Sequence, residues 1–475
     1  MPQADRYPSW VGLVYIFNLI VGTGALTLPA AFAGAGWLFS TFMMMFLAFI
    51  SFVTVTFVIE SMACANATLT RNRIQSDELY ENRIEALSDS EPEPDHSNEE
   101  TAILRVPRRY SLYKLDTKVE LSEIAALYLN KFGHTLFFSS LCIYLYGDLA
   151  IYTAASGKTL VNLICNNGNE TEDYSTTCFQ NSSFTKIDMY RMFVTTFALL
   201  VGPFAYFNVQ KTKYLQLFTI CIRWLAFFIM VTLASIRLAK LGPQGHPDLI
   251  DLKEVPALAG STVYSFMCHH SLPSLMSPIS DKDKIVKKVS YDFFAIFSFY
   301  LLLALTGSFA FATLKDLYSL NFIYSNDSNF ITKIIGFFLV SFPLFPMSTS
   351  FPIIAITLQS NLKNLMLDST THRSNVGINR LVFPTLAVAP PVIVALCTHN
   401  IKYLVEITGT YAGVIVQYVV PTILVNYARK QCLKDFGSCS HQFSSPFRHR
   451  FWYIFVISWS IICVIFVTVD FAINR

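Results

Sequence analysis

One stretch of the first apolar segment gives the strongest indication of the fold. It reads Asn18-Leu19-Ile20-Val21-Gly22-Thr23-Gly24-Ala25-Leu26-Thr27-Leu28-Pro29. The two glycines permit backbone conformations that expose N–H and C=O groups, and the proline removes a helix donor. We therefore expect two half-helices that meet in the middle of a membrane. The positive end of the second half-helix would suit a carboxylate, and the freed carbonyls would suit an ammonium group or a cation. A small-residue packing face for a neighbouring helix is the alternative.

The overall composition is that of a membrane protein. Of the 475 residues, 53% are hydrophobic and only 14% are charged, whereas an average soluble domain has about 25% charged residues. The net charge of +3 is too small to indicate nucleic-acid binding. The 10 cysteines lie mostly inside apolar runs, which excludes a disulfide framework or a structural metal site. The fold class expected is all-α and polytopic.

Eleven apolar segments approach the roughly 20 residues that a spanning helix needs. They are Trp10–Ala31, Leu38–Ala63, Thr135–Ile164, Met189–Tyr206, Leu215–Leu238, Ala257–Pro278, Tyr291–Leu314, Ile331–Leu358, Leu381–Thr398, Tyr403–Tyr427 and Phe451–Ile473. We expect one integral membrane domain in three parts. Residues 1–69 hold the first two spans, residues 70–118 form a disordered acidic loop, and residues 119–475 hold a surface helix and the remaining spans.

Lys and Arg concentrate in the loops after the even-numbered segments, so the N-terminus is expected in the cytosol. The sequons at Asn169, Asn181 and Asn326 then fall on the opposite side, where we expect them to carry glycans. Cys165 and Cys178 share one loop on that side, and this compartment permits a disulfide between them.

The acidic loop contains Glu99-Glu100-Thr101-Ala102-Ile103-Leu104, which resembles a signal for sorting to endosomes and lysosomes. It predicts a sorting adaptor as a partner and favours an endolysosomal membrane over the plasma membrane. After the loop, residues 119–130 place apolar side chains at helical spacing. We expect an amphipathic helix on the membrane surface there.

The sixth apolar segment predicts a second interruption. Residues 264–278 contain two histidines, four serines and two prolines within an otherwise apolar run. Interrupted helices at equivalent places in two halves indicate a transporter site, and the first and sixth segments are equivalent if two five-helix repeats are related by inversion. Phe266, Cys268, His269 and His270 are therefore candidate substrate-binding residues. A proline kink is the alternative, and each histidine alone is also typical of a hydrogen-bonded structural residue.

Ionisable residues at membrane depth are rare and usually functional. Asp148 lies inside the third segment, where it would bind a cation, a proton or an amine, or hydrogen-bond to a neighbouring helix. Arg223 lies inside the fifth segment, and we consider Asp148 and Glu406 as its partners.

These patterns resemble the amino acid/auxin permease family, part of the wider amino acid–polyamine–organocation superfamily. The resemblance covers nearly the whole chain. Its most specific stretches are Val11–Tyr15, Asn18–Pro29, Gln210–Tyr214, Ser271–Leu275 and Ser445–His449. It implies eleven spans, the inverted repeat and a cytosolic N-terminus, in agreement with the expectations above.

The resemblance also implies roles for individual residues. Gly22, Thr23 and Gly24 match the unwound part of the first helix, where backbone groups hold the ends of the substrate. Asn18 matches an asparagine near the sodium of sodium-coupled neutral amino acid transporters, and Cys268-His269 resembles their Cys-His pair. Further sodium partners would be Ser348, Thr349 and Ser350. Their proline-rich setting departs from the family pattern, which leaves Na⁺ and H⁺ as alternative coupling ions.

The predicted function is ion-coupled secondary transport of amino acids or related small zwitterions by alternating access. No metal, cofactor or nucleic acid is expected, and the Gly-x-x-x-x-Gly-Lys-Ser/Thr nucleotide-binding pattern does not occur. One alternative is a membrane nutrient sensor that binds an amino acid with little transport. Another is an intramembrane enzyme using His269 or His270, but no paired carboxylates or acyl-transfer motif accompany these histidines.

Overall fold

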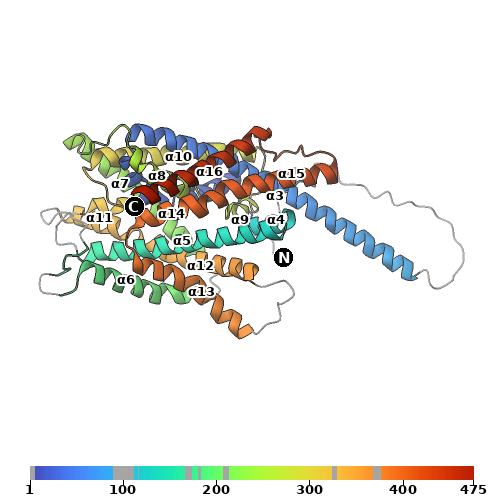
Figure 1. Cartoon of the computed structure of the whole chain (residues 1–475), viewed down its shortest axis with the longest axis horizontal. Coiled ribbons are helices and arrows are strands. Elements are labelled where there is room, and N and C mark those ends of the chain that lie inside the picture. The colour runs from blue at the N-terminus through green and yellow to red at the C-terminus, as the bar shows by residue number, and fades with distance from the viewer. Residues whose placement is uncertain are drawn as a thin grey trace.

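The computed structural model describes residues 6–88, 112–115, 117–165, 174–179, 183–206, 213–323, 329–366 and 376–474. Within these ranges the regular structure is helical, apart from isolated β-bridges that join Tyr7 to Ile279 and Thr177 to Thr185. Figure 1 shows the long helices running side by side in one bundle. The expected all-α fold class is confirmed.

Helices occupy all of the predicted apolar segments. They are α1 (Ser9–Ile20), α2 (Gly24–Gly34), α3 (Trp37–Ser88), α4 (Leu121–Tyr128), α5 (Lys131–Ile164), α6 (Lys186–Val201), η2 (Gly202–Tyr206), α7 (Lys213–Leu241), η3 (Leu252–Glu254), α8 (Val255–Ser265), α9 (Leu272–Met276), α10 (Ile285–Ala310), η4 (Tyr318–Phe322), α11 (Phe330–Ser341), α12 (Leu344–Met366), α13 (Val376–Cys397), α14 (Ile401–Ile407), η5 (Thr408–Gly413), η6 (Ile415–Val419), α15 (Val420–Phe436) and α16 (Arg450–Asn474). In the described part of the chain, 8 helices are long and apolar enough to cross a membrane, or 9 with the bent pair α1 and α2. The protein is therefore a multi-pass membrane protein, and the total of eleven spans with an inverted repeat stays a prediction.

The helices form two groups that meet at the centre of the bundle. In one group α5 packs against α6, α12 and α13, which lie together along the lower side of Figure 1. In the other group α2 packs against α8 and α10, and α3 packs against α10 and α15. The ends of α2 and α8 at the two interruptions line one cavity together with residues of α5 and α12.

Both predicted interruptions are present. α1 and α2 form a pair bent by 56° around Val21–Thr23. α8 ends at Ser265, and the short α9 begins only at Leu272. Glycine, proline and serine account for these breaks because they weaken or compete with helical hydrogen bonding.

Two further irregularities were not predicted. The eighth apolar segment divides at Phe342-Pro343 into α11 and α12, and the tenth contains the π-helical stretches η5 and η6. A π-helix has no simple sequence signal, and such segments are frequent at functional sites.

The long helix α3 differs from the expected loop. It continues to Ser88, well into the segment from residue 70 that we expected to be disordered. Good helix formers such as Arg, Glu, Leu and Ala dominate this part of the sequence, so it can remain helical without a packed partner. Arg71 also forms an ion pair with Asp435 of α15 at 2.7 Å. Figure 1 shows the end of α3 extending beyond the bundle.

The expected amphipathic helix between the acidic loop and the third span is present as α4. Its apolar residues Leu121, Ile124 and Ala125 are buried, and they pack where α4 meets α3, α5 and α15. The apolar face of α4 therefore contacts protein, whereas the sequence suggested contact with lipid.

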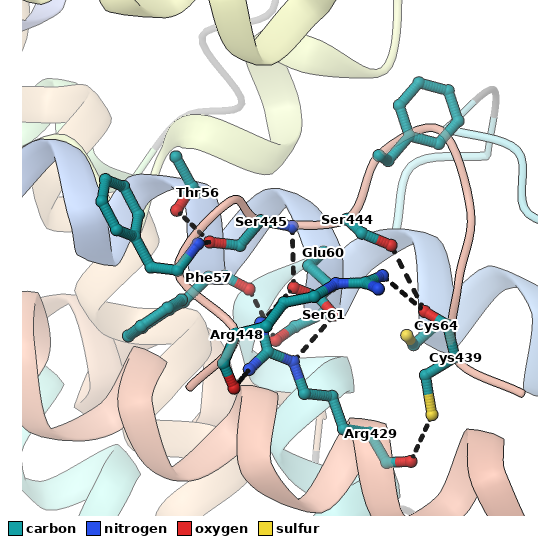
Figure 2. Close-up of polar contacts among 12 residues, drawn as sticks. Thr56, Phe57, Glu60, Ser61, Cys64, Arg429, Cys439, Ser444, Ser445 and Arg448 are labelled. Atoms are coloured by element: carbon teal, nitrogen blue, oxygen red, sulfur yellow. Dashed lines mark hydrogen bonds and ion pairs between the residues drawn. The ribbon is translucent and has the colours of Figure 1, made fainter. Parts of the chain in front are cut away.

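Residues 437–449, which we call the C-terminal strap, connect α15 to α16 and are fastened to α3. The Glu60 side chain is fully buried and accepts hydrogen bonds from Arg429 Nε at 2.8 Å and from the Ser445 backbone N–H at 2.9 Å. Thr56 and Ser445 join their hydroxyl groups at 2.7 Å. Figure 2 shows these groups converging between the strap, α3 and α15. A buried ion pair therefore holds three distant segments together.

The side of the bundle predicted to be non-cytosolic is also cross-linked. Cys165 and Cys178 form a disulfide with a Cα–Cα distance of 4.7 Å, which is the pair expected from the sequence. Nearby, the buried Lys158 of α5 forms an ion pair with Asp316 at 3.0 Å, ahead of η4. The sequons at Asn169, Asn181 and Asn326 lie outside the described residues, as does the Glu99–Leu104 segment.

Candidate functional site

A cavity of about 230 Å³ lies between the two interruptions. The two breaks and the helices α5, α7 and α12 form its walls. The sequence-predicted residues that line it are Asn18, Gly22, Thr23, Gly24, Asp148, His270 and Ser350. Residues far apart in the chain thus meet in one small polar space at the centre of the bundle.

A chain of hydrogen bonds crosses this cavity. The Tyr264 hydroxyl, at the end of α8, donates to the Asp148 carboxylate of α5 at 2.5 Å. The same phenol oxygen lies 2.9 Å from the Thr23 hydroxyl in the first break. Because Tyr264 donates its one proton to Asp148, Thr23 donates to Tyr264. Asp148 therefore both lines the cavity and hydrogen-bonds to a neighbouring helix.

Arg223 reaches the cavity from α7, and its contacts differ from the partners considered from the sequence. Its Nη1 atom donates to the carbonyl oxygens of Asn18 at 2.6 Å and Val21 at 3.1 Å. These carbonyls belong to the C-terminal end of α1. The guanidinium therefore lies at the broken helix instead of forming an ion pair with Asp148 or Glu406.

Tyr300 of α10 connects the two broken helices. Its hydroxyl lies 2.7 Å from the Ile20 carbonyl oxygen and 3.0 Å from the Ser265 carbonyl oxygen. These carbonyls end α1 and α8, so one buried phenol serves two helix ends that lack their usual partners.

The two adjacent histidines point to different places. His269 is fully buried, and its Nε2 atom lies 2.9 Å from the Thr54 hydroxyl of α3. His270 lines the cavity, with its ring 5.6 Å from the Tyr144 ring, and its buried Nδ1 atom has no hydrogen-bond partner among the described residues. The Nδ1 atom of His269 is buried without a partner in the same way, so the two rings differ in position: His270 lies at the cavity, whereas His269 packs against α3.

Phe266 and Cys268 also face away from the cavity. Phe266 is fully buried, with its ring 5.2 Å from Tyr300 and 6.3 Å from Phe293. Cys268 is fully buried as well. Neither is among the residues that line the cavity, so our expectation of substrate contact at these two positions finds no support in this arrangement.

The predicted sodium partners are only partly brought together. Asn18 lines the cavity, where its amide donates to the Val14 carbonyl at 3.0 Å. The Thr349 hydroxyl lies 3.2 Å from the Phe345 carbonyl oxygen of its own helix. Of the three neighbours on α12, Ser350 lines the cavity, and Ser348 and Thr349 do not.

Several lining residues escaped sequence-based prediction. They are Tyr144, Tyr152, Tyr264, Met267, Ser271 and Thr357. A tyrosine or a threonine in an apolar helix gives no signal of which way it faces, because that depends on how the helix is rotated in the bundle. Within the described residues, no group of three or more His, Cys, Asp or Glu side chains could hold a metal ion.

Two interrupted membrane helices around a small cavity are typical of many secondary transporters. The sequence profile of the family described as "Transmembrane amino acid transporter protein" matches residues 8–76 and 105–468. The chain therefore belongs to this family, as the resemblance implied.

Relatives from several organisms match along nearly the whole length. The chain is 44% identical to Transmembrane protein 104 of Homo sapiens, with 99% of this chain and 98% of the relative covered. It is 42% identical to the Transmembrane protein 104 homolog of Drosophila melanogaster, with 98% and 97% covered.

A solved structure has the same fold. The crystal structure of MhsT in complex with L-phenylalanine superposes with a TM-score of 0.52 at 12% sequence identity, and 99% of each chain is covered. At this low identity the likeness supports the fold alone.

Proposed function

We propose that the protein is a secondary active transporter of amino acids or related small zwitterions that works by alternating access. One observation carries the proposal: the cavity between the two broken helices holds one fixed carboxylate and one fixed guanidinium, from Asp148 and Arg223. A zwitterion has the same balance of charges, so it can be received without leaving a net charge in the membrane interior.

The broken helices offer complementary ends to such a substrate. α2 begins at Gly24, so the N–H groups of its first turn and its positive dipole end suit a carboxylate at Gly22–Gly24. The substrate ammonium would lie near Asp148, with the Tyr264 hydroxyl between the two ends. MhsT, which has this fold, was crystallised with an amino acid, and this supports the substrate class.

The distribution of lining residues supports alternating access. Under the predicted orientation, Asn18, Ser271 and Thr357 come from the cytosolic side of the breaks. On the other side, the Lys158–Asp316 ion pair joins α5 to the segment before η4. We infer that this arrangement corresponds to a state that faces the cytosol, and that the ion pair separates when the cavity opens outward.

Symport with an ion gradient would drive accumulation, and Asp148 is the carboxylate available at the cavity for a coupling proton. A membrane of the endolysosomal system is the proposed location, reached through a sorting adaptor that reads Glu99–Leu104. Replacing Ile103 and Leu104 by alanine should move the protein to the plasma membrane, as seen by immunofluorescence. Removal of glycans by an endoglycosidase, followed by electrophoresis, tests Asn169, Asn181 and Asn326.

The decisive experiment combines ligand binding with flux. The purified protein is screened by thermal shift against the amino acids, since a ligand that prefers the folded state raises its apparent stability. Each hit is then measured as radiolabelled uptake into proteoliposomes. We expect at least one amino acid that stabilises the protein, is transported, and loses both effects in Gly22→Val. Binding without flux would favour the nutrient sensor, and a full panel without any hit would refute the substrate class.

A further inference from the structure

The C-terminal end of α1 is a site of partial negative charge. The last carbonyls of any helix have no partner within that helix, and together they carry a partial negative charge of about half an electron. In α1 this end lies deep in the bundle, at Asn18–Val21. A cation is the natural partner for such a group of oxygens, and the sequence resemblance suggested a bound sodium ion.

A side chain already occupies these oxygens. Arg223 Nη1 lies 2.6 Å from the Asn18 carbonyl oxygen and 3.1 Å from the Val21 carbonyl oxygen. The Ile20 carbonyl oxygen between them accepts from the Tyr300 hydroxyl at 2.7 Å. An arginine is charged at every physiological pH, so this positive charge is permanently present.

The residue after Arg223, Trp224, packs α7 against two other helices. The ring of Trp224 lies 4.7 Å from the Phe17 ring of α1 and 6.0 Å from the Phe299 ring of α10. α7 is thereby fixed against the very helix whose end the guanidinium caps. The charge is part of the chain and does not have to be drawn from solution.

Little space remains beside the guanidinium. A second cavity, lined by Thr23, Tyr152, Arg223, Met347 and Ser350 among others, has a volume of only about 10 Å³. That is at the lower limit for one water molecule. This cavity lies between the first break and α12, where the sodium partners Asn18 and Ser348–Ser350 would have to converge. A second cation here would also face the guanidinium at short range.

We infer that the guanidinium of Arg223 is a tethered cation that takes the place of a bound sodium ion at the carbonyl end of α1. The site for a monovalent cation is therefore filled by the chain itself, and the protein neither binds nor requires sodium there. The expectation that transport does not require sodium rests on the proposed function. The expectation that sodium does not bind at this place is independent of it.

The first test measures sodium binding without any substrate. The full chain in detergent is heated in NaCl, KCl or choline chloride at equal ionic strength. We expect wild-type melting temperatures that agree within about 1 °C among the three salts, and no saturable binding of radioactive sodium. Arg223→Ala uncovers the carbonyls, so this variant should gain a stabilisation that rises with sodium concentration and is absent in choline.

Two variants serve as controls. Arg223→Lys keeps a positive charge on the same helix and should remain insensitive to sodium. Arg237→Ala removes an exposed arginine of α7 whose guanidinium lies over the Phe311 ring at 4.8 Å, and it should behave as the wild type. A sodium-specific shift or saturable sodium binding in the wild type would overturn the inference. That measurement stands even if Arg223→Ala fails to fold, and a folded Arg223→Ala without a sodium response would also overturn it.

The second test concerns transport. Uptake of the amino acid identified by the thermal screen is measured in proteoliposomes with sodium or with choline. We expect rates that agree within about twofold, and a tenfold loss in choline would contradict the tethered cation. If no amino acid is transported at all, the proposed function fails, whereas the sodium-binding measurement still decides the role of Arg223.

Discussion

Gly24 lies against Ser265 so closely that a Cβ atom on Gly24 would be 2.6 Å from the Ser265 Cα atom. The start of α2 and the end of α8 therefore touch through their backbones, and the two interruptions form one structural unit. Gly22 differs, because a Cβ there would meet nothing nearer than the Leu19 carbonyl oxygen at 3.8 Å, and the residue lines the cavity. Two glycines in one motif thus have separate roles.

Gly24→Ala is expected to destabilise the fold, because a methyl group has to displace the backbone of α8. Overpacking of this kind typically costs about 1–3 kcal/mol, which should appear as a lower melting temperature without ligand. Gly22→Ala is the matched control and should melt like the wild type. Equal melting temperatures for the two variants would contradict the close contact.

Asp148→Asn should reduce substrate affinity while the fold is retained. The amide oxygen can still accept from Tyr264, but the negative charge opposite Arg223 is gone. A hydrogen bond to a charged group contributes about 1.5–3 kcal/mol, so we expect affinity to fall roughly 10- to 100-fold. Calorimetric titration with the amino acid from the screen measures this. Unchanged affinity would remove Asp148 from the site.

Replacing His269 and replacing His270 by alanine should have different effects on stability and ligand affinity. His269→Ala removes a fully buried ring and its hydrogen bond to the Thr54 hydroxyl, and the lost hydrogen bond alone is expected to cost about 0.5–1.5 kcal/mol of stability. His270→Ala should melt close to the wild type but change ligand affinity, because this ring lines the cavity. Thermal melts with and without ligand distinguish the two effects. The opposite ranking would show that the assignments are reversed.

The buried pair of Glu60 and Arg429 should be strongly coupled. Arg429→Gln leaves the fully buried Glu60 charge without compensation and is expected to cost about 3–5 kcal/mol, whereas Glu60→Gln should cost less because Arg429 is partly exposed. The double variant should lose less than the sum of the two single losses. Denaturant unfolding of all four proteins completes the cycle. Strict additivity would mean that Glu60 and Arg429 do not stabilise each other.

The C-terminal strap should weaken on acidification through His441. Burial lowers the pKa of His441 from its ordinary value of 6.5 to about 4. The ring stacks on Tyr113 at 4.4 Å, and its Nε2 atom lies 3.6 Å from the Cys64 sulfur. Glu60, Arg429 and Arg448 are the charged groups near it.

Because folding lowers the pKa of His441, protonation of this ring favours the unfolded state over the folded state. The contribution of His441 to stability is complete above about pH 6.5 and is lost as the pH falls toward 4. The melting temperature of the wild type should therefore decrease more steeply over this range than that of His441→Gln. Parallel curves would show that His441 does not titrate with unfolding.

Much of the fold could be predicted because its signals are local. The lengths of the apolar runs, the glycines at positions 22 and 24, and the prolines and serines of residues 264–278 act through their own backbone chemistry. The helices and both interruptions occur where these signals lie. We did not predict the helical end of α3, because we interpreted the acidic residues of this segment as a sign of disorder and gave less weight to its helix-forming residues.

The candidate site was predictable only in part. The sequence by itself determined that the helices break and which polar residues lie near each break. Only the tertiary structure decided that His270 and not His269 faces the cavity, that Ser350 is the serine of α12 that lines it, and that Arg223 caps α1. The physical reason is that a backbone break arises within a few neighbouring residues, whereas the direction of a side chain depends on how helices from distant parts of the chain rotate and pack together.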